Sequence, residues 1–191
     1  MRLQRPRAPD PLRDHHEPRF GPELLRHYLG ELVYGANDGI ITTFAVVSGV
    51  AGAALSPATA LILGLANLFA DGFSMGASAY LAIRSREAVR AQGGLEVEEP
   101  FPPRHALATG VAFVIAGAVP LAAFAVAPVE ARFAVASAVT LLTLFVVGAL
   151  RALVTPMRWF RAGIEMLAVG SVAAVVAYGV GRAVKDLLVG G

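Results

Sequence analysis

Two aspartates interrupt long apolar stretches of this sequence. Asp38 lies in YGANDGIITTFAVVSGVAGA, residues 34–53, and Asp71 lies in GLANLFADGFSMGASAYLA, residues 64–82. A carboxylate in hydrocarbon is costly, so such a residue faces a partner, a water-filled cavity or an ion. Met75 adds a thioether four residues after Asp71. Two carboxylates and a thioether in neighbouring apolar helices indicate a metal-ion site.

The candidate ligand atoms differ in softness. Asp38 and Asp71 offer carboxylate oxygens, Asn67 offers a carbonyl oxygen and Met75 offers sulfur. Sulfur favours transition metals over Mg²⁺ and Ca²⁺, which prefer oxygen. The mixture favours Fe²⁺ or Mn²⁺, because Zn²⁺ and Cu⁺ usually bind His or Cys. The chain has no Cys, and no His lies within an apolar stretch.

Metal binding to these aspartates is linked to proton release. A carboxylate binds metal only when deprotonated, whereas a low-dielectric surrounding favours the protonated acid. Metal ions and protons therefore compete for the same side chains. This competition predicts antiport, in which a metal ion is exchanged for protons.

The elements that position these residues belong to a membrane protein. Of the 191 residues, 56% are hydrophobic and 16% are charged, and the mean hydropathy is +0.63. A helix needs about 20 residues to cross the hydrocarbon core. We predict an all-α, polytopic membrane protein with five transmembrane helices, at about residues 32–55, 58–83, 106–127, 133–154 and 163–184.

Polar segments flank a transmembrane domain that spans residues 31–184. Residues 1–30 are predicted to form a basic cytoplasmic tail, disordered at first because it is rich in Pro and Arg, with a short interfacial helix at 21–30. Residues 84–104 form a short cytoplasmic loop, and residues 185–191 form a short outer tail.

Several charged residues outside the two aspartate stretches have a structural interpretation as well as a functional one. His15 and His16 are expected to be solvated, and Glu87, Glu96, Glu98 and Glu99 either attract cations or make the loop soluble. His105 is expected to be an interfacial residue. An ion pair with Arg161, four residues earlier, accounts for Glu165.

Lys and Arg are distributed unevenly around the predicted spans. The tail, the 84–104 loop and the connection between the fourth and fifth spans hold thirteen of the 16. Because such residues are enriched on the cytoplasmic side, the N-terminus is predicted to be cytoplasmic and the C-terminus outside. The same distribution explains the net charge of +2 without nucleic-acid binding.

The first two spans are joined by a short turn and form an antiparallel hairpin. At about 1.5 Å per residue from the cytoplasmic boundary, Asp38 lies roughly 9 Å deep, Met75 roughly 12 Å and Asp71 roughly 18 Å. Asn67, Asp71 and Met75 are spaced i, i+4, i+8 and share one helix face. We therefore expect Asp38 and Met75 to be nearly level, with Asp71 about one turn further in.

Small residues recur on both helices of this hairpin. Gly35 and Gly39 are four residues apart, as are Gly72 and Gly76. This spacing lets helix backbones approach closely in membranes. It predicts tight packing and is not specific to any function.

The segments YGANDGIITTFAVVSGVAGA and ANLFADGFSMGASAYLA resemble the first two helices of the vacuolar iron transporter (VIT/CCC) family. The resemblance extends over most of residues 31–181 in the layout of the spans. It implies a five-helix homodimer that takes Fe²⁺ or Mn²⁺ from the cytoplasm. It also implies that the metal leaves in exchange for protons, along a path at the dimer interface.

The resemblance also implies roles for individual residues. Asp38 matches the family's pore aspartate, and Met75 matches its pore methionine. Glu31 falls where plant and protist members carry an acid at the cytoplasmic entrance. Asn67 falls where those members carry a glutamate, and Asp71, one turn closer to Met75, restores the missing charge.

The connection 84–104 departs from the eukaryotic members of that family. It is too short for the long, Glu-rich metal-binding domain that those transporters place there. The layout is similar to the compact prokaryotic members, which implies a location in the inner (plasma) membrane.

Two other classes of function compete with transport. An intramembrane enzyme would need a base, and the predicted spans contain no His, Cys or Lys, so we predict that the chain is not an enzyme. A non-transporting membrane scaffold or assembly subunit remains an alternative, because glycine-rich packing faces suit either role. We expect no cofactor, since the metal ion is the substrate and protons are the coupling ion.

Overall fold

The computed structural model describes residues 22–153 and 155–189, and every regular element in them is helical. The predicted all-α class is confirmed for this part of the chain. The predictions for residues 1–20, including His15 and His16, lie outside the described residues. The elements are α1 (Pro22–Gly52), α2 (Pro57–Gln92), α3 (Pro102–Val126), η1 (Val129–Ala131), α4 (Arg132–Leu150), η2 (Arg151–Leu153) and α5 (Trp159–Val189).

Local sequence signals set the ends of α2. Ser56 precedes Pro57, and its Oγ accepts a hydrogen bond from the backbone N–H of Thr59 at 3.2 Å. A serine cap followed by proline in the first turn is a favoured helix start. At the other end the chain turns at Gly93 and Gly94, where Gly94 has a φ of +70°. A positive φ carries little penalty for glycine.

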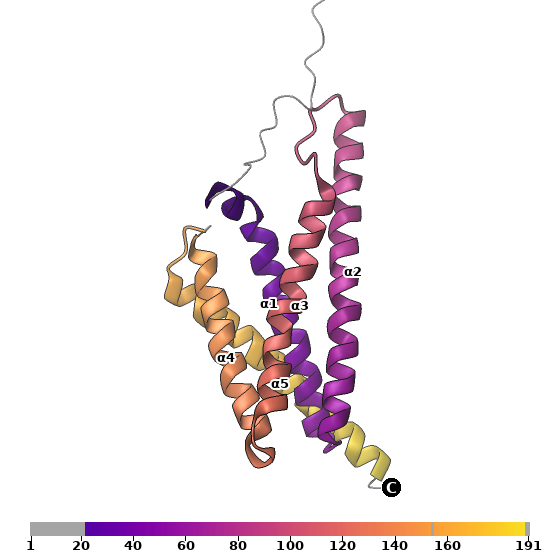
Figure 1. The fold of residues 1–191 in the computed structure, drawn as a ribbon, viewed down its shortest axis with the longest axis vertical. Coiled ribbons are helices and arrows are strands. Elements are labelled where there is room, and N and C mark those ends of the chain that lie inside the picture. The colour runs from indigo at the N-terminus through magenta and orange to yellow at the C-terminus, as the bar shows by residue number, and fades with distance from the viewer. Residues whose placement is uncertain (1–21, 154, 190–191) are drawn as a thin grey trace, which may run out of the picture.

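Four helices extend further than the predicted spans. α2 continues through residues 84–92 and α3 begins at Pro102, so more than half of the predicted loop 84–104 is helical. α5 runs from Trp159 to Val189, so the predicted outer tail is helical through residue 189. α1 begins at Pro22 and runs without a break into the predicted first span. Residues 22–30 of the predicted interfacial segment therefore form the first part of α1, and Figure 1 shows this part turning away from the rest of the helix.

Four of the helical segments are long and apolar enough to cross a membrane: those containing α2, α3, α4 and α5. The chain is thus a multi-pass membrane protein. α1 is also long, but Asn37 and Asp38 and its glycines and threonines reduce its apolar character. The prediction of a fifth span at α1 stays a prediction.

Helix α1 contacts all four of the other α-helices, and α1 and α2 both pack against α3 along its length. α1 also packs against α5, and α4 and α5 form a second pair (Figure 1). The glycine pairs explain the contacts of α1 and α2 with α3. A Cβ on Gly35 or Gly39 would collide with a backbone carbonyl of α3, and one on Gly76 would lie 3.0 Å from the Ala106 carbonyl oxygen.

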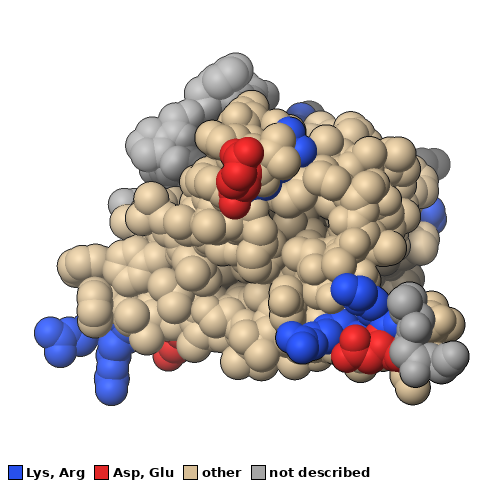
Figure 2. All heavy atoms as spheres, turned by 90° about the horizontal axis from the view of Figure 1, so that it is seen from below, with Lys and Arg blue, Asp and Glu red and all other residues tan. Residues whose placement is uncertain are grey.

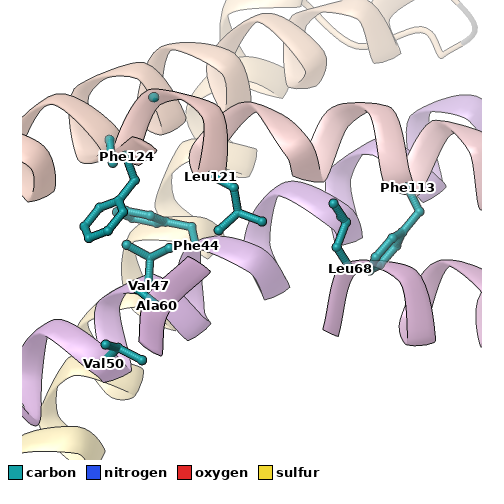
Figure 3. Packing of buried hydrophobic residues seen from close by; sticks show 10 residues of the cluster. Phe44, Val47, Val50, Ala60, Leu68, Phe113, Leu121 and Phe124 are labelled. Atoms are coloured by element: carbon teal, nitrogen blue, oxygen red, sulfur yellow. The ribbon is translucent and has the colours of Figure 1, made fainter. Parts of the chain in front are cut away.

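The main apolar core fills the space between α1, α2 and α3. Phe44 and Val47 from α1, Leu68 from α2, and Phe113 and Leu121 from α3 are all buried there (Figure 3). Phe113 is fully buried and lies beside the glycine contacts. The core and the small-residue contacts together fix the positions of the three helices.

Most of the outer surface is apolar. Phe69 and Phe73 on α2 and Val172 and Val175 on α5 are exposed, as expected for side chains that face lipid. Figure 2 views the molecule from the end at which α5 finishes, and charged residues occupy only a few separated places there.

We predict that Gly39→Ala destabilises the bundle. Its new Cβ would meet the Phe113 carbonyl oxygen, so α3 would have to move. Overpacking of this kind costs about 1–3 kcal/mol. Thermal unfolding of the detergent-solubilised protein, followed by circular dichroism, should show a lower midpoint.

Gly179→Ala is the matched control, because no atom lies within 4 Å of a Cβ built there. Alanine is favoured over glycine in helices by about 0.5–1 kcal/mol. This variant should keep or raise the midpoint. Equal midpoints for the two variants would contradict the tight contact at Gly39.

Candidate functional site

Asp38 and Asp71 face a common region between α1 and α2. Both side chains are half-buried, and their charges are close enough to repel each other. Among the described residues, neither aspartate forms an ion pair with a Lys, Arg or His. Like charges without a counter-ion favour the uptake of a cation or a proton.

Met75 and Asn67 flank Asp71 on α2. Met75 is half-buried and packs against the core cluster that includes Leu68 and Phe113. Asn67 is also half-buried, and its Nδ2 is buried without a hydrogen-bond partner within the described chain. A buried polar atom without a partner is costly. The structure thus brings the two aspartates together and leaves Asn67 with unused hydrogen-bonding capacity.

Glu31 lies in a separate cluster with two histidines. Its Oε1 lies 2.8 Å from Nδ1 of His105, and Nε2 of His105 lies 2.7 Å from Oε2 of Glu99. His27 Nε2 lies 3.7 Å from the same Glu99 oxygen. His105 is only 3% exposed and lies between two carboxylates, and its predicted position at the membrane interface stays a prediction.

Sequence patterns do not predict that His27, Glu99 and His105 form one group. One signal was present, since His27 and Glu31 are spaced i, i+4 and share a face of α1. The other two members come from the loop before α3 and from the first turn of α3. Their approach depends on how α1 and α3 pack.

The acidic residues of the α2–α3 connection have structural partners. Glu87 accepts hydrogen bonds from the backbone N–H groups of Glu98, at 3.1 Å, and Glu99, at 3.3 Å. Arg90 lies 3.1 Å from a carboxylate oxygen of Glu98. These contacts fix the loop and direct Glu99 toward His105. A pocket of about 670 Å³ adjoins it, lined by Glu31, Ile83, Ser85, Arg86, Glu87, Val89, Arg90, Glu98, Glu99 and His105.

Glu165 has a different partner from the one predicted. It lies 3.9 Å from Arg151 in η2, and no ion pair with Arg161 is found among the described residues. The packing of α5 against η2 brings Arg151 close, which helical spacing alone does not predict. Glu165, Arg151 and Asn37 line a second pocket, of about 760 Å³.

The VIT family profile matches residues 29–99 and 87–182, which cover α2, α3 and α4 and most of α1 and α5. The chain belongs to the VIT family. A protein named vacuolar iron transporter from Plasmodium berghei is 49% identical over 57 residues, 30% of this chain and 21% of that protein. The chain thus matches about a fifth of the length of that relative.

Other members align over more of the chain. Vacuolar iron transporter homolog 1 of Oryza sativa is 33% identical over 167 residues, covering 80% of this chain and 72% of that protein. Vacuolar iron transporter 1 of Eucalyptus grandis is 26% identical over 234 residues, covering 92% of each. That alignment has more positions than the 191 residues of this chain, so it contains gaps where the Eucalyptus protein has additional residues. Such gaps are expected for a compact VIT chain. These names describe transporters and not enzymes, as predicted.

We predict that Asp38→Asn stabilises the metal-free VIT protein. The substitution removes a charge that is disfavoured first by its burial and second by the nearby Asp71, and it keeps the shape of the side chain. A gain of about 1 kcal/mol would raise the thermal midpoint by about 2–4 °C for a chain of this size. The measurement is thermal unfolding in a chelator at neutral pH.

Asp186→Asn is the matched control, since Asp186 is 69% exposed and pairs with Arg182. It should leave the midpoint unchanged. A lower midpoint for Asp38→Asn would show that Asp38 has a stabilising partner and would contradict the repulsion.

Proposed function

We propose that this VIT protein exports a divalent transition metal ion, Fe²⁺ or Mn²⁺, from the cytoplasm. The observation that supports this most directly is the pair of half-buried carboxylates, Asp38 and Asp71, without a counter-ion in the described chain. The names of the relatives add support. In this proposal Asp38 and Met75 are ligands, and Asp71 and Asn67 complete the coordination.

The pathway requires a second copy of the chain. Among the described helices, α2 has its main contacts with α1 and α3. Ser74 and Ser78, three and seven residues after Asp71 on the same side of α2, are exposed. A homodimer formed along α1 and α2 would place two sets of aspartates around one path. The unpaired Nδ2 of Asn67 would gain a partner or water there. The aspartates would then face an aqueous interior instead of lipid.

The proposed topology has five spans, with the N-terminus in the cytoplasm. It requires α1 to cross the membrane although α1 is not among the four helices that are apolar enough by composition, which is acceptable for a helix that lines a polar path. Glu31 then lies at the cytoplasmic entrance. The relatives are named for the vacuole, and we place this compact chain in the inner (plasma) membrane.

Proton exchange follows from the chemistry of the ligands. Asp38 and Asp71 bind a metal ion only as carboxylates, and without metal a proton relieves their repulsion. Entry of protons from outside would release the metal ion and reset the site. Each cycle then moves metal outward and protons inward.

A scaffold role is the second candidate. Met75 packs against the apolar core, as a methionine without a metal-binding role would. Transport assays separate the two candidates, because a scaffold moves no metal.

We predict that the full chain in proteoliposomes accumulates Mn²⁺ and Fe²⁺, and that uptake rises when the lumen is made acidic. Asp38→Ala and Met75→Leu should each reduce the initial rate at least tenfold, because each removes a ligand. Asp186→Ala and Met157→Leu are matched controls at positions away from the aspartates and should keep the wild-type rate.

An initial uptake rate that is the same with and without a pH gradient would contradict proton exchange. Wild-type rates in both Asp38→Ala and Met75→Leu would contradict the ligand assignment. No uptake of any of Fe²⁺, Mn²⁺, Co²⁺ and Zn²⁺ would favour the scaffold.

We predict that two exposed loop positions lie on opposite sides of the membrane. The chain has no native Cys, so Leu95→Cys before α3 and Val129→Cys after it provide single labelling sites. In intact cells a membrane-impermeant maleimide should label residue 129 and not residue 95. Lysis should expose both, and the reverse pattern would overturn the topology.

A further inference from the structure

The cluster formed by His27, Glu99 and His105 has the composition of a metal site. One ligand atom from each of the three lies within 4.8 Å of the others. Two imidazoles and one carboxylate form a ligand set found in Fe²⁺ and Zn²⁺ proteins. The three residues come from α1, the α2–α3 loop and α3, and lie well apart from Asp38 in the sequence.

The distances within the cluster suit a small cation. Ligands about 2.0–2.1 Å from a tetrahedral ion are about 3.4 Å from one another. The Glu99 oxygen lies 2.7 Å from His105 Nε2 and 3.7 Å from His27 Nε2. Shifts of under an ångström would bring both pairs to that spacing.

The contacts of His105 add an independent observation. Both of its ring nitrogens lie within hydrogen-bond distance of a carboxylate oxygen, and the ring is 97% buried, being 3% exposed. A neutral imidazole has only one N–H to donate. The second contact therefore calls for a cation, either a second proton or a metal ion.

Glu31 makes the arrangement specific. An N–H of His105 at Nδ1 donated to Glu31 would leave the lone pair of Nε2 directed toward Glu99 and His27. A carboxylate that holds a histidine in this tautomer is the usual outer partner of a metal-bound imidazole. Glu87 fixes the other ligand, since it accepts the backbone N–H groups of Glu98 and Glu99.

A route for the ion is present. The 670 Å³ pocket is lined by Glu99 and His105 and extends to Glu87 and Glu98. The lining includes two arginines: Arg90 pairs with Glu98 and Glu87, which offsets its charge, and Arg86 is exposed. His27 lies on the exposed side of the cluster.

We propose that His27, Glu99 and His105 bind a divalent transition metal ion, with Glu31 orienting His105. This site is distinct from the region between Asp38 and Asp71. It joins α1, the loop and α3 at the end of the bundle predicted to face the cytoplasm. The proposal does not require that the protein transports metal.

The test uses Co²⁺, whose visible absorption reports nitrogen and oxygen ligands in a low-symmetry site. The untagged full chain carrying Asp38→Ala and Met75→Leu is titrated in detergent, so that the proposed transport ligands are absent. We expect one bound Co²⁺ per chain with visible bands. Adding His27→Ala or Glu99→Gln should weaken binding at least tenfold and change the bands.

Two controls separate this site from other ligands. Glu96→Gln changes an exposed acid of the same loop, and His15→Ala with His16→Ala removes the remaining histidines. Both should bind Co²⁺ as the parent does. Glu31→Gln should weaken binding by about tenfold, as expected for a partner outside the ligand set. Circular dichroism confirms that each variant is folded.

Each outcome is decisive. Absence of Co²⁺ binding in the parent, or equal binding after His27→Ala and Glu99→Gln, would overturn the proposal. Absence of metal uptake by the wild-type chain in proteoliposomes, together with Co²⁺ binding at the cluster, would refute the proposed function alone.

Discussion

The contact of α3 with glycines on two helices is the constraint on which the rest of the structure depends. Asp38 directly precedes Gly39, Asp71 precedes Gly72, and each of these glycines lies against α3. A side chain next to a contact glycine is turned about 100° around the helix. The two aspartates therefore lie beside the line along which α1 and α2 contact α3, and both face the region between α1 and α2. The residue that contacts α3 is in each case the glycine that follows the aspartate.

This arrangement combines a rigid frame with an unfavourable charge pair. Phe113 and Leu68 fill the core next to the glycines, so the backbone of α1 and α2 cannot easily separate. Natural proteins retain such strained polar groups where they serve a function. Repulsion between Asp38 and Asp71 is thus balanced by apolar packing elsewhere in the bundle, and a bound cation would relieve it.

Some of this organisation can be read from the sequence and some cannot. Helix number, the Asp38 and Asp71 pair and the glycine contacts follow from local patterns, because each depends on residues a few positions apart. The burial of His105 and the partner of Glu165 depend on where α1, α3 and η2 meet in space. The extension of α2 to Gln92 is not predicted, because charged residues mark the end of an apolar span and not the end of a helix, which continues readily into water.

The length of α2 has a mechanical consequence. It is one uninterrupted helix from Pro57 to Gln92, so it would move as a rigid body. Asp71 lies near the middle of α2. Glu87 lies near its C-terminal end, where it accepts hydrogen bonds from the backbone of the α2–α3 loop. A small tilt of α2 about its contacts with α3 would displace both together. A change in position at Asp71 and a change in the conformation of the α2–α3 loop would therefore be coupled.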